Sequence, residues 1–162
     1  MIASKDFRTY ILRPTLLRLG LYSEAAENLL IGTAATESRL GTYLVQRGGG
    51  PALGIYQIEP KTHRSIWDDY LAYHPVLADK VKGFASHASL KALRIPDAEL
   101  ISNLDYATAI ARVIYYRRPE PLPEAHDIYG LALYYKQHFN TPKGKATTQD
   151  FLRQYQACGC AS

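Results

Sequence analysis

Apolar residues recur along most of this 162-residue chain with the period of an α-helix, and prolines and glycines separate the periodic segments. The clearest segment runs from Ser23 to Gly41, where Ser23 is placed to cap the first helical turn. One face of this helix carries Ala26, Leu29, Leu30, Thr33, Ala34, Leu40 and Gly41. A chain dominated by such stripes is expected to fold mainly into helices.

Residues that start or stop helices predict the other elements. Pro14 begins a short helix that Gly20 ends, and Pro60 begins a helix that stops before Pro75. The remaining predicted helices are 75–86, a region opened by Asp97 that includes 103–118, then 128–139, and 148–156 behind a capping box of Thr147 and Asp150.

The segments between these helices indicate one domain. Gly48 to Gly50 must lie in a loop, and residues 54–59 are expected to be briefly extended. Too little chain follows the proline-rich stretch 118–127 to form a second core, so this stretch is a connection within one domain. We therefore expect a single, mainly α domain over residues 1–162, with a small extended or β segment around residues 44–59.

Charge and hydropathy exclude several classes of protein. The net charge of +4, from 19 Lys and Arg against 15 Asp and Glu, is compatible with an anionic partner such as a cell wall. The basic residues are scattered apart from Arg117-Arg118 and the stretch 143–145, so no nucleic acid partner is expected. No apolar run approaches the roughly 20 residues of a membrane span, and no span is expected.

The two ends of the chain carry no functional signal. Residues 1–14 lack the apolar core of a signal peptide, so we expect synthesis in the cytoplasm without export by the usual route. Cys158 and Cys160 are expected to be incidental thiols on a frayed tail, because their spacing neither staples a fold nor binds zinc. We expect no metal and no cofactor.

Glu37 is the one residue that conflicts with its position in the helical pattern. It falls on the apolar face, three residues after Ala34 and seven after Leu30. Two explanations are open: the carboxylate pairs with a buried cation or caps another element, or the apolar setting raises its pKa so that it acts as a general acid. A general acid of this kind is what cleavage of a glycosidic bond requires.

Four motifs follow Glu37 in an order that resembles the lysozyme-like lytic transglycosylases and goose-type lysozymes, in particular their bacteriophage members. The family has Glu-Ser near a helix end and a "GLMQI" or "GPFQI" segment roughly twenty residues later. Here these places are taken by Glu37-Ser38 and by Gly54 to Ile58, "GIYQI". The other matching segments are 57–71, "QIEPKTHRSIWDDYL", 103–117, "NLDYATAIARVIYYR", and 134–155, "YYKQHFNTPKGKATTQDFLRQY".

The resemblance covers about residues 25 to 156 and implies a lysozyme-like fold with a catalytic core over about residues 22–156. It implies that Glu37 is the catalytic acid and that the substrate-binding residues are Ser38, Tyr56, Gln57, Tyr135 and Asn140. The family has adjacent Tyr and Asn in its last motif, whereas this chain has Phe139-Asn140. Tyr134 and Tyr135 lie one turn earlier, and we predict that Tyr135 supplies the hydroxyl that contacts Glu37.

The implied activity is cleavage of the β-1,4 bond between N-acetylmuramic acid and N-acetylglucosamine in peptidoglycan glycan strands. A lytic transglycosylase, with one catalytic Glu and a 1,6-anhydro product, is the primary interpretation. A muramidase that hydrolyses the same bond, with Glu59 as the nearest second carboxylate, and a non-catalytic phage virion protein are the alternatives. We expect a monomer that reaches the wall after release by a holin or as a virion component.

Other polar and aromatic residues are expected to have structural roles. Core packing is favoured for Trp67, surface or capping positions for His63 and His74, and a solvated helix face for Asp68-Asp69. The glycine triplet lacks the Gly-Lys-Ser/Thr ending of a phosphate-binding loop, which argues against nucleotide binding.

Overall fold

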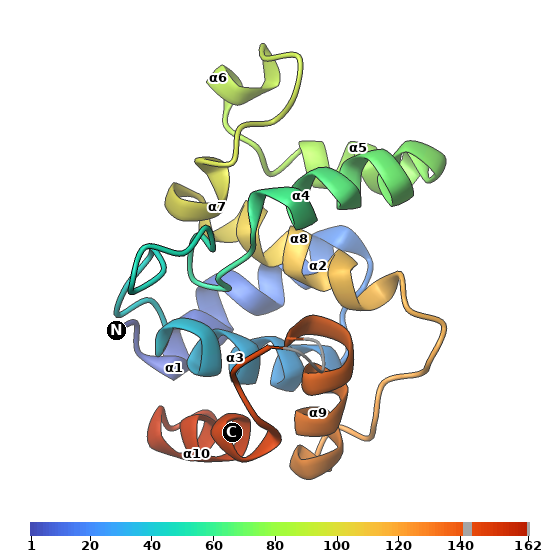
Figure 1. Cartoon of the computed structure of the whole chain (residues 1–162). Coiled ribbons are helices and arrows are strands. Elements are labelled where there is room, and N and C mark those ends of the chain that lie inside the picture. The colour runs from blue at the N-terminus through green and yellow to red at the C-terminus, as the bar shows by residue number, and fades with distance from the viewer. Residues whose placement is uncertain (141–143, 162) are drawn as a thin grey trace.

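The computed structural model describes residues 1–140 and 144–161, most of which lie in helices (Figure 1). The first helical segment ends at Gly20, which has a φ of 72° in the left-handed region that favours glycine. Sequence analysis missed its first half, where Phe7 and Leu12 are fully buried and hold the chain against the core. The parts of this segment are α1 Ser4–Asp6, the π-helix η1 Phe7–Leu12 and α2 Arg13–Leu19.

The predicted helix after Ser23 forms as α3 Glu24–Ser38, and the Ser23 hydroxyl accepts a hydrogen bond from the amide of Ala26 at 3.0 Å. The helix ends three residues before the predicted Gly41. Arg39 and Leu40 have φ values of 50° and 52°, and this left-handed backbone stops the α-helical hydrogen-bond series.

The remaining predicted helices form in the predicted order, with two differences: the helix predicted over residues 75–86 ends at Lys82, and the short helix at 87–90 was not predicted. The helix that Pro60 begins is built from α4 Pro60–Ser65, the π-helix η2 Ile66–Tyr70 and the 3-10 helix η3 Leu71–Tyr73. After it come α5 Pro75–Lys82, α6 His87–Leu90, α7 Glu99–Ser102 and α8 Leu104–Tyr116. The chain closes with α9 Ile128–Tyr135, the π-helix η4 Lys136–Asn140 and α10 Thr148–Ala157.

Two helix caps test the sequence analysis directly. The capping box of Thr147 and Asp150 is present at the start of α10, as predicted. The predicted cap Asp97 is wrong: Asn103 caps α8 instead, and its side-chain oxygen accepts a hydrogen bond from the amide of Tyr106 at 3.0 Å.

The predicted extended segment is largely turns. Among the described residues, pairing in this region consists of isolated bridges between Val45 and Leu53 and between Leu53 and Ile58. Gly54 and Gln57 have φ values of 76° and 48°, and a chain with these left-handed residues cannot continue as a strand. The expectation of a small extended or β segment is therefore correct only for these two bridges.

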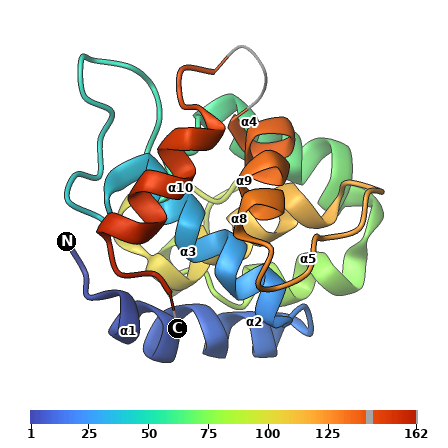
Figure 2. The ribbon, with the colours of Figure 1, turned by 90° about the horizontal axis from the view of Figure 1, so that it is seen from below.

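Helix α3 occupies the middle of the molecule and contacts α8, α9, α10 and η1. Figure 1 shows α3 between α8 above and α10 below, and Figure 2 shows α10 and α9 lying across it, with α1 and α2 along the opposite side. Its low amphipathicity agrees with this position, because a helix with neighbours on most sides is apolar on most sides.

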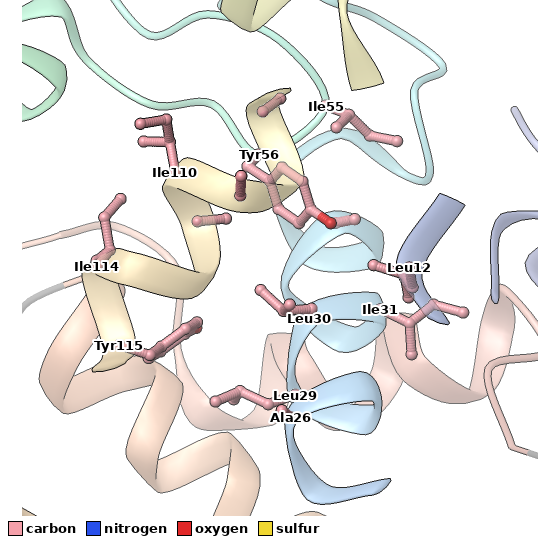
Figure 3. Packing of buried hydrophobic residues seen from close by; sticks show 14 of the residues in the cluster. Leu12, Ala26, Leu29, Leu30, Ile31, Ile55, Tyr56, Ile110, Ile114 and Tyr115 are labelled. Carbon is pink, nitrogen blue, oxygen red and sulfur yellow. The ribbon is translucent and has the colours of Figure 1, made fainter. Parts of the chain in front are cut away.

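Apolar and aromatic residues of α3 and α8 form the centre of the core (Figure 3). Tyr56 and Tyr115 are fully buried there and their hydroxyls are paired, with Thr108 at 3.0 Å and with Thr33 at 2.7 Å. This pairing removes the cost of burying an unsatisfied hydroxyl, so that the large rings can fill the core.

The C-terminal tail is docked and not frayed, which corrects the expectation for Cys158 and Cys160. Both thiols are buried, and Arg8 donates a hydrogen bond at 2.5 Å to the backbone carbonyl of Cys160. Arg8 also forms a buried ion pair with Glu27 of α3, at 2.9 Å. The two ends of the chain are thus fastened to each other and to the central helix.

Gly32 of α3 allows the close approach of α10, because a Cβ atom at this position would collide with the ring of Phe151. Gly32→Ala is therefore expected to lower the free energy of unfolding by about 1–3 kcal/mol, the usual cost of overpacking, although alanine favours a helix. Urea denaturation measures this loss. Phe151→Leu makes room for the methyl group, so the same Gly32→Ala change should cost less in that background. An equal or larger cost there would contradict the proposed contact.

Candidate functional site

The carboxyl group of Glu37 projects from the last turn of α3 toward α9. The hydroxyl of Tyr135 donates a hydrogen bond to Glu37 Oε1 at 2.7 Å. The choice of Tyr135 over Tyr134 is therefore confirmed; Tyr134 instead donates to the carbonyl of Glu120 at 2.8 Å.

The pKa of Glu37 is raised to about 7 from the ordinary 4.5. Removal of the carboxyl group from water is the largest cause, and hydrogen bonds from Tyr135 and Asn140 partly oppose it because they stabilise the ionised form. The apolar face thus has the effect on Glu37 that the general-acid explanation requires. Among residues 1–140 and 144–161, no Lys or Arg lies at salt-bridge distance from this carboxyl group, so this part of the chain does not supply the buried cation of the alternative explanation.

Asn140 reaches this site through η4 and is held by Lys136. The ammonium group of Lys136 donates hydrogen bonds to Asn140 Oδ1 at 2.9 Å and to the carbonyls of Gly144 and Ala146, each at 2.8 Å. Sequence analysis missed this role of Lys136, because a lysine on a helix is usually solvated. Residues 141–143 of the same motif lie outside the described residues.

Glu37 lies in a cleft of about 590 Å³ that also contains Gln57 and Asn140. The side-chain amide of Gln57 donates to the carbonyl of Gly54 at 2.8 Å, which fixes its orientation. The phenol of Tyr43, another lining residue, donates to the backbone carbonyl of Glu37 at 2.9 Å. Polar groups from α3, the 43–62 region and η4 therefore line one cleft.

Ser38 and Tyr56 do not line the cleft, which corrects their assignment as binding residues. Both are fully buried. The Ser38 hydroxyl donates to the carbonyl of Ile55 at 2.6 Å and accepts from the amide of Gly41 at 2.9 Å. Ser38 thereby ties the end of α3 to the turn that carries Gln57.

Glu59 lines the same cleft as Glu37. Its carboxylate lies 3.3 Å from the ammonium group of Lys61, and its side chain is 38% exposed. The cleft therefore contains two carboxyl groups in different settings, one largely removed from water and one open to it.

His63 and Trp67 lie outside this cleft. His63 is buried and not on the surface as expected: Asp97 lies 2.8 Å from its Nδ1 and the hydroxyl of Tyr106 lies 2.6 Å from its Nε2. Trp67 donates to the same hydroxyl at 2.9 Å. These residues connect α4 and η2 to α8 and line a separate cavity of about 920 Å³.

Comparisons of the chain with protein-family models, with curated proteins and with solved structures find no match. Within residues 1–140 and 144–161, no three His, Cys, Asp or Glu side chains gather as they would around a metal ion. In the same part of the chain, the helices lack the length and apolar character needed to cross a bilayer.

Ionisation of Glu37 is expected to cost folding stability, because its pKa is about 7 in the folded protein and 4.5 in an ordinary glutamate. Its stabilising contribution is complete below pH 4.5 and is lost as the pH rises through 7. The total loss is on the order of 3 kcal/mol. Glu37→Gln cannot ionise, so its unfolding free energy relative to the wild type should rise over this range, as urea denaturation at a series of pH values would measure.

Tyr135→Phe provides the companion measurement. Loss of the hydroxyl removes a hydrogen bond that lowers the pKa of Glu37, so the pH-dependent loss of stability should move to higher pH. Wild type and Glu37→Gln with parallel stability curves across the range would contradict the raised pKa.

Proposed function

We propose that this protein cleaves the β-1,4 bond between N-acetylmuramic acid and N-acetylglucosamine in peptidoglycan, with Glu37 as the general acid. The observation that carries the proposal is a carboxyl group with a pKa of about 7, held by Tyr135 and Asn140 in an open cleft. Such a group is protonated in a large fraction of molecules near neutral pH and can give its proton to a glycosidic oxygen.

The first step is proton transfer from Glu37 to the oxygen that bridges the two sugars. The bond from this oxygen to the anomeric carbon of the muramoyl unit breaks, and positive charge develops on that carbon. The neighbouring N-acetyl oxygen is placed to stabilise this charge. Tyr135 and Asn140 stabilise the carboxylate that remains, because both hydrogen bonds favour the ionised form.

Glu37 then acts as the base. It accepts the proton of the muramoyl 6-hydroxyl, whose oxygen attacks the anomeric carbon and closes a 1,6-anhydro ring. The cycle exchanges one C–O bond at the anomeric carbon for another, returns Glu37 to its protonated form, and uses no acid or base other than Glu37. Intramolecular attack avoids the entropy loss of recruiting a separate nucleophile, which favours this route over hydrolysis.

Hydrolysis of the same bond is the second candidate function, and the position of Glu59 is the observation that favours it. A conventional glycosidase needs two carboxyl groups about 5 to 9.5 Å apart, and Glu59 lines the cleft of Glu37. A protein that only binds the wall or a virion partner is the non-enzymatic alternative, for which the pKa of Glu37 has no use.

Glu37→Gln is expected to lower the rate of peptidoglycan lysis by about 10³-fold or more, because it removes the proton donor. Gln57→Ala and Asn140→Ala should cost less, about 10- to 100-fold, since these groups position the sugar. Turbidity of purified cell walls and zymograms measure the rates. Glu24→Gln is the matched control, because Glu24 is an exposed carboxylate at the other end of α3.

Lysis by the wild type should also decrease above about pH 7, where Glu37 loses its proton. If folded Glu37→Gln keeps more than a few per cent of wild-type lysis, Glu37 is not the acid. If the wild type itself clears no peptidoglycan, the binding alternative holds.

The product distinguishes the two enzymatic candidates. A transglycosylase yields muropeptides that end in 1,6-anhydro-N-acetylmuramic acid, one water lighter than hydrolysis products and without a reducing end. We expect these to dominate the mass spectrum of a wild-type digest, and Glu59→Gln to keep this product. A digest dominated by reducing-end muropeptides would instead identify a hydrolase. Glu59 would then be the first candidate to test as its second catalytic carboxylate.

A further inference from the structure

The cleft around Glu37 carries more positive charge than its acid chemistry needs. Among the described residues, five Lys or Arg side chains line it, against the two carboxyl groups of Glu37 and Glu59. When Glu37 is protonated, only Glu59 is left to offset them. The cationic lining residues are Arg47, Lys61, Arg117, Arg118 and Lys145.

Most of these cations have no carboxylate at salt-bridge distance among the described residues. Lys61 pairs with Glu59 at 3.3 Å, and Arg47 lies over the ring of Tyr43, 4.4 Å from its centre. Within the described part of the chain, Arg117, Arg118 and Lys145 have no carboxylate at salt-bridge distance. Their charges are therefore available to a ligand in the cleft.

Arg117 shows most clearly that these cations are not there for stability. Its Nε atom is buried and has no hydrogen-bond partner among the described residues. Burial and repulsion from the adjacent Arg118 both lower the pKa of Arg117, and the attraction of the Asp69 carboxylate only partly opposes them, so the charge of Arg117 is held in an unfavourable place. A cation near the C-terminal end of α8 is stabilised by the helix dipole. That stabilisation does not require a second arginine, and it does not require a buried Nε atom without a hydrogen-bond partner.

The arginines do not tune the catalytic acid either. Burial, Tyr135 and Asn140 account for the pKa of Glu37. A cation close to Glu37 would favour the ionised form and oppose its role as a proton donor. Arg117 and Arg118 thus share the cleft with Glu37 without acting on its titration.

We propose that Arg117 and Arg118, with Lys145 and Arg47 beside them, form a subsite for carboxylates of the glycan strand, so that the protein selects an acidic glycan over a neutral one. This inference rests on the proposed function, because it assumes that a glycan occupies the cleft. Each muramoyl unit of the substrate carries a lactyl group and, when substituted, a peptide with further carboxylates. Guanidinium groups bind carboxylates in a two-point geometry that lysine does not match.

The experiment uses the full-length Glu37→Gln protein, which should bind without cleaving, and compares three glycans. The first is a peptidoglycan strand with its peptides, the second is a strand whose peptides an amidase has removed to leave lactyl carboxylates, and the third is a neutral β-1,4 N-acetylglucosamine oligomer. Binding is measured by calorimetry or fluorescence at low and high salt. Acidic strands should bind at least about 10-fold more tightly than the neutral oligomer, and this preference should shrink with salt.

The test variant adds Arg117→Gln and Arg118→Gln, and the control adds Lys5→Gln and Lys91→Gln. The control lowers the net charge equally at exposed residues that do not line the cleft. The test variant should weaken binding of acidic strands by about 10- to 100-fold, leave binding of the neutral oligomer within about 2-fold, and melt like the control. Loss of affinity for the strand without peptides would identify the lactyl carboxylate as the ligand, and loss only for the substituted strand would identify the peptide carboxylates.

Three results would overturn the subsite. They are unchanged affinity for acidic strands in the test variant, equal losses for acidic and neutral glycans, and tighter binding of a single-stranded DNA oligonucleotide than of either strand. Failure of the proposed function looks different: wild-type protein that lyses no wall, while the arginine-dependent preference for acidic strands persists, would refute cleavage and leave the subsite standing. Lysis of the wall without an arginine-dependent preference for acidic strands would support cleavage and refute the subsite.

Discussion

The contact between Glu37 and Tyr135 holds a titratable group at the wall of an open cleft, where burial among the helices raises its pKa. A carboxyl group that enters an apolar setting either finds a cation or becomes harder to ionise. Here the partners are a phenol at 2.7 Å and an amide, which soften the pKa shift without cancelling it. A buried arginine in their place would have produced a stable carboxylate with no proton to give.

The central position of α3 follows from the same requirement. Its middle turns pack against neighbouring helices, and the absence of a side chain at Gly32 leaves room for the ring of Phe151 of α10. Its last turn carries Glu37 at the wall of the cleft, and the left-handed residues after Ser38 end the helix there. Ser38 fixes that turn through its bond to the carbonyl of Ile55. The packed part of α3 and the part that lines the cleft are thus separated by only a few residues.

Local sequence signals predicted the parts of the fold that depend on nearby residues. Ser23, Pro60 and the Thr147 capping box act within one or two turns, and the helices that they begin form as expected. The conflict between Glu37 and its apolar face was also visible locally, because it needs only the helical period. For these features, the physical cause and the sequence signal occupy the same short stretch.

The errors concern residues whose environment comes from distant parts of the chain. The burial of His63 depends on Asp97 and Tyr106, which lie 34 and 43 residues away. The docking of the cysteine tail depends on Arg8, 152 residues before Cys160. The motif residues Ser38 and Tyr56 adjoin Glu37 and Gln57 in the sequence, but no local pattern separates a residue that lines a cleft from one that is buried behind it.

The cleft combines two demands that oppose each other electrostatically. A proton donor is favoured by low polarity and by distance from cations, whereas an acidic polymer is attracted by cations with unsatisfied charge. The structure separates the two within one cavity: Glu37 is covered by α3, α9 and η4, while Arg117 and Arg118 lie at the end of α8 and Arg47 lies beyond the first turn after α3. Glu59 neutralises Lys61 and leaves the other cations unmatched. In the proposed complex, a glycan with one acidic group per repeat satisfies those cations along its length while it presents a neutral glycosidic oxygen to Glu37.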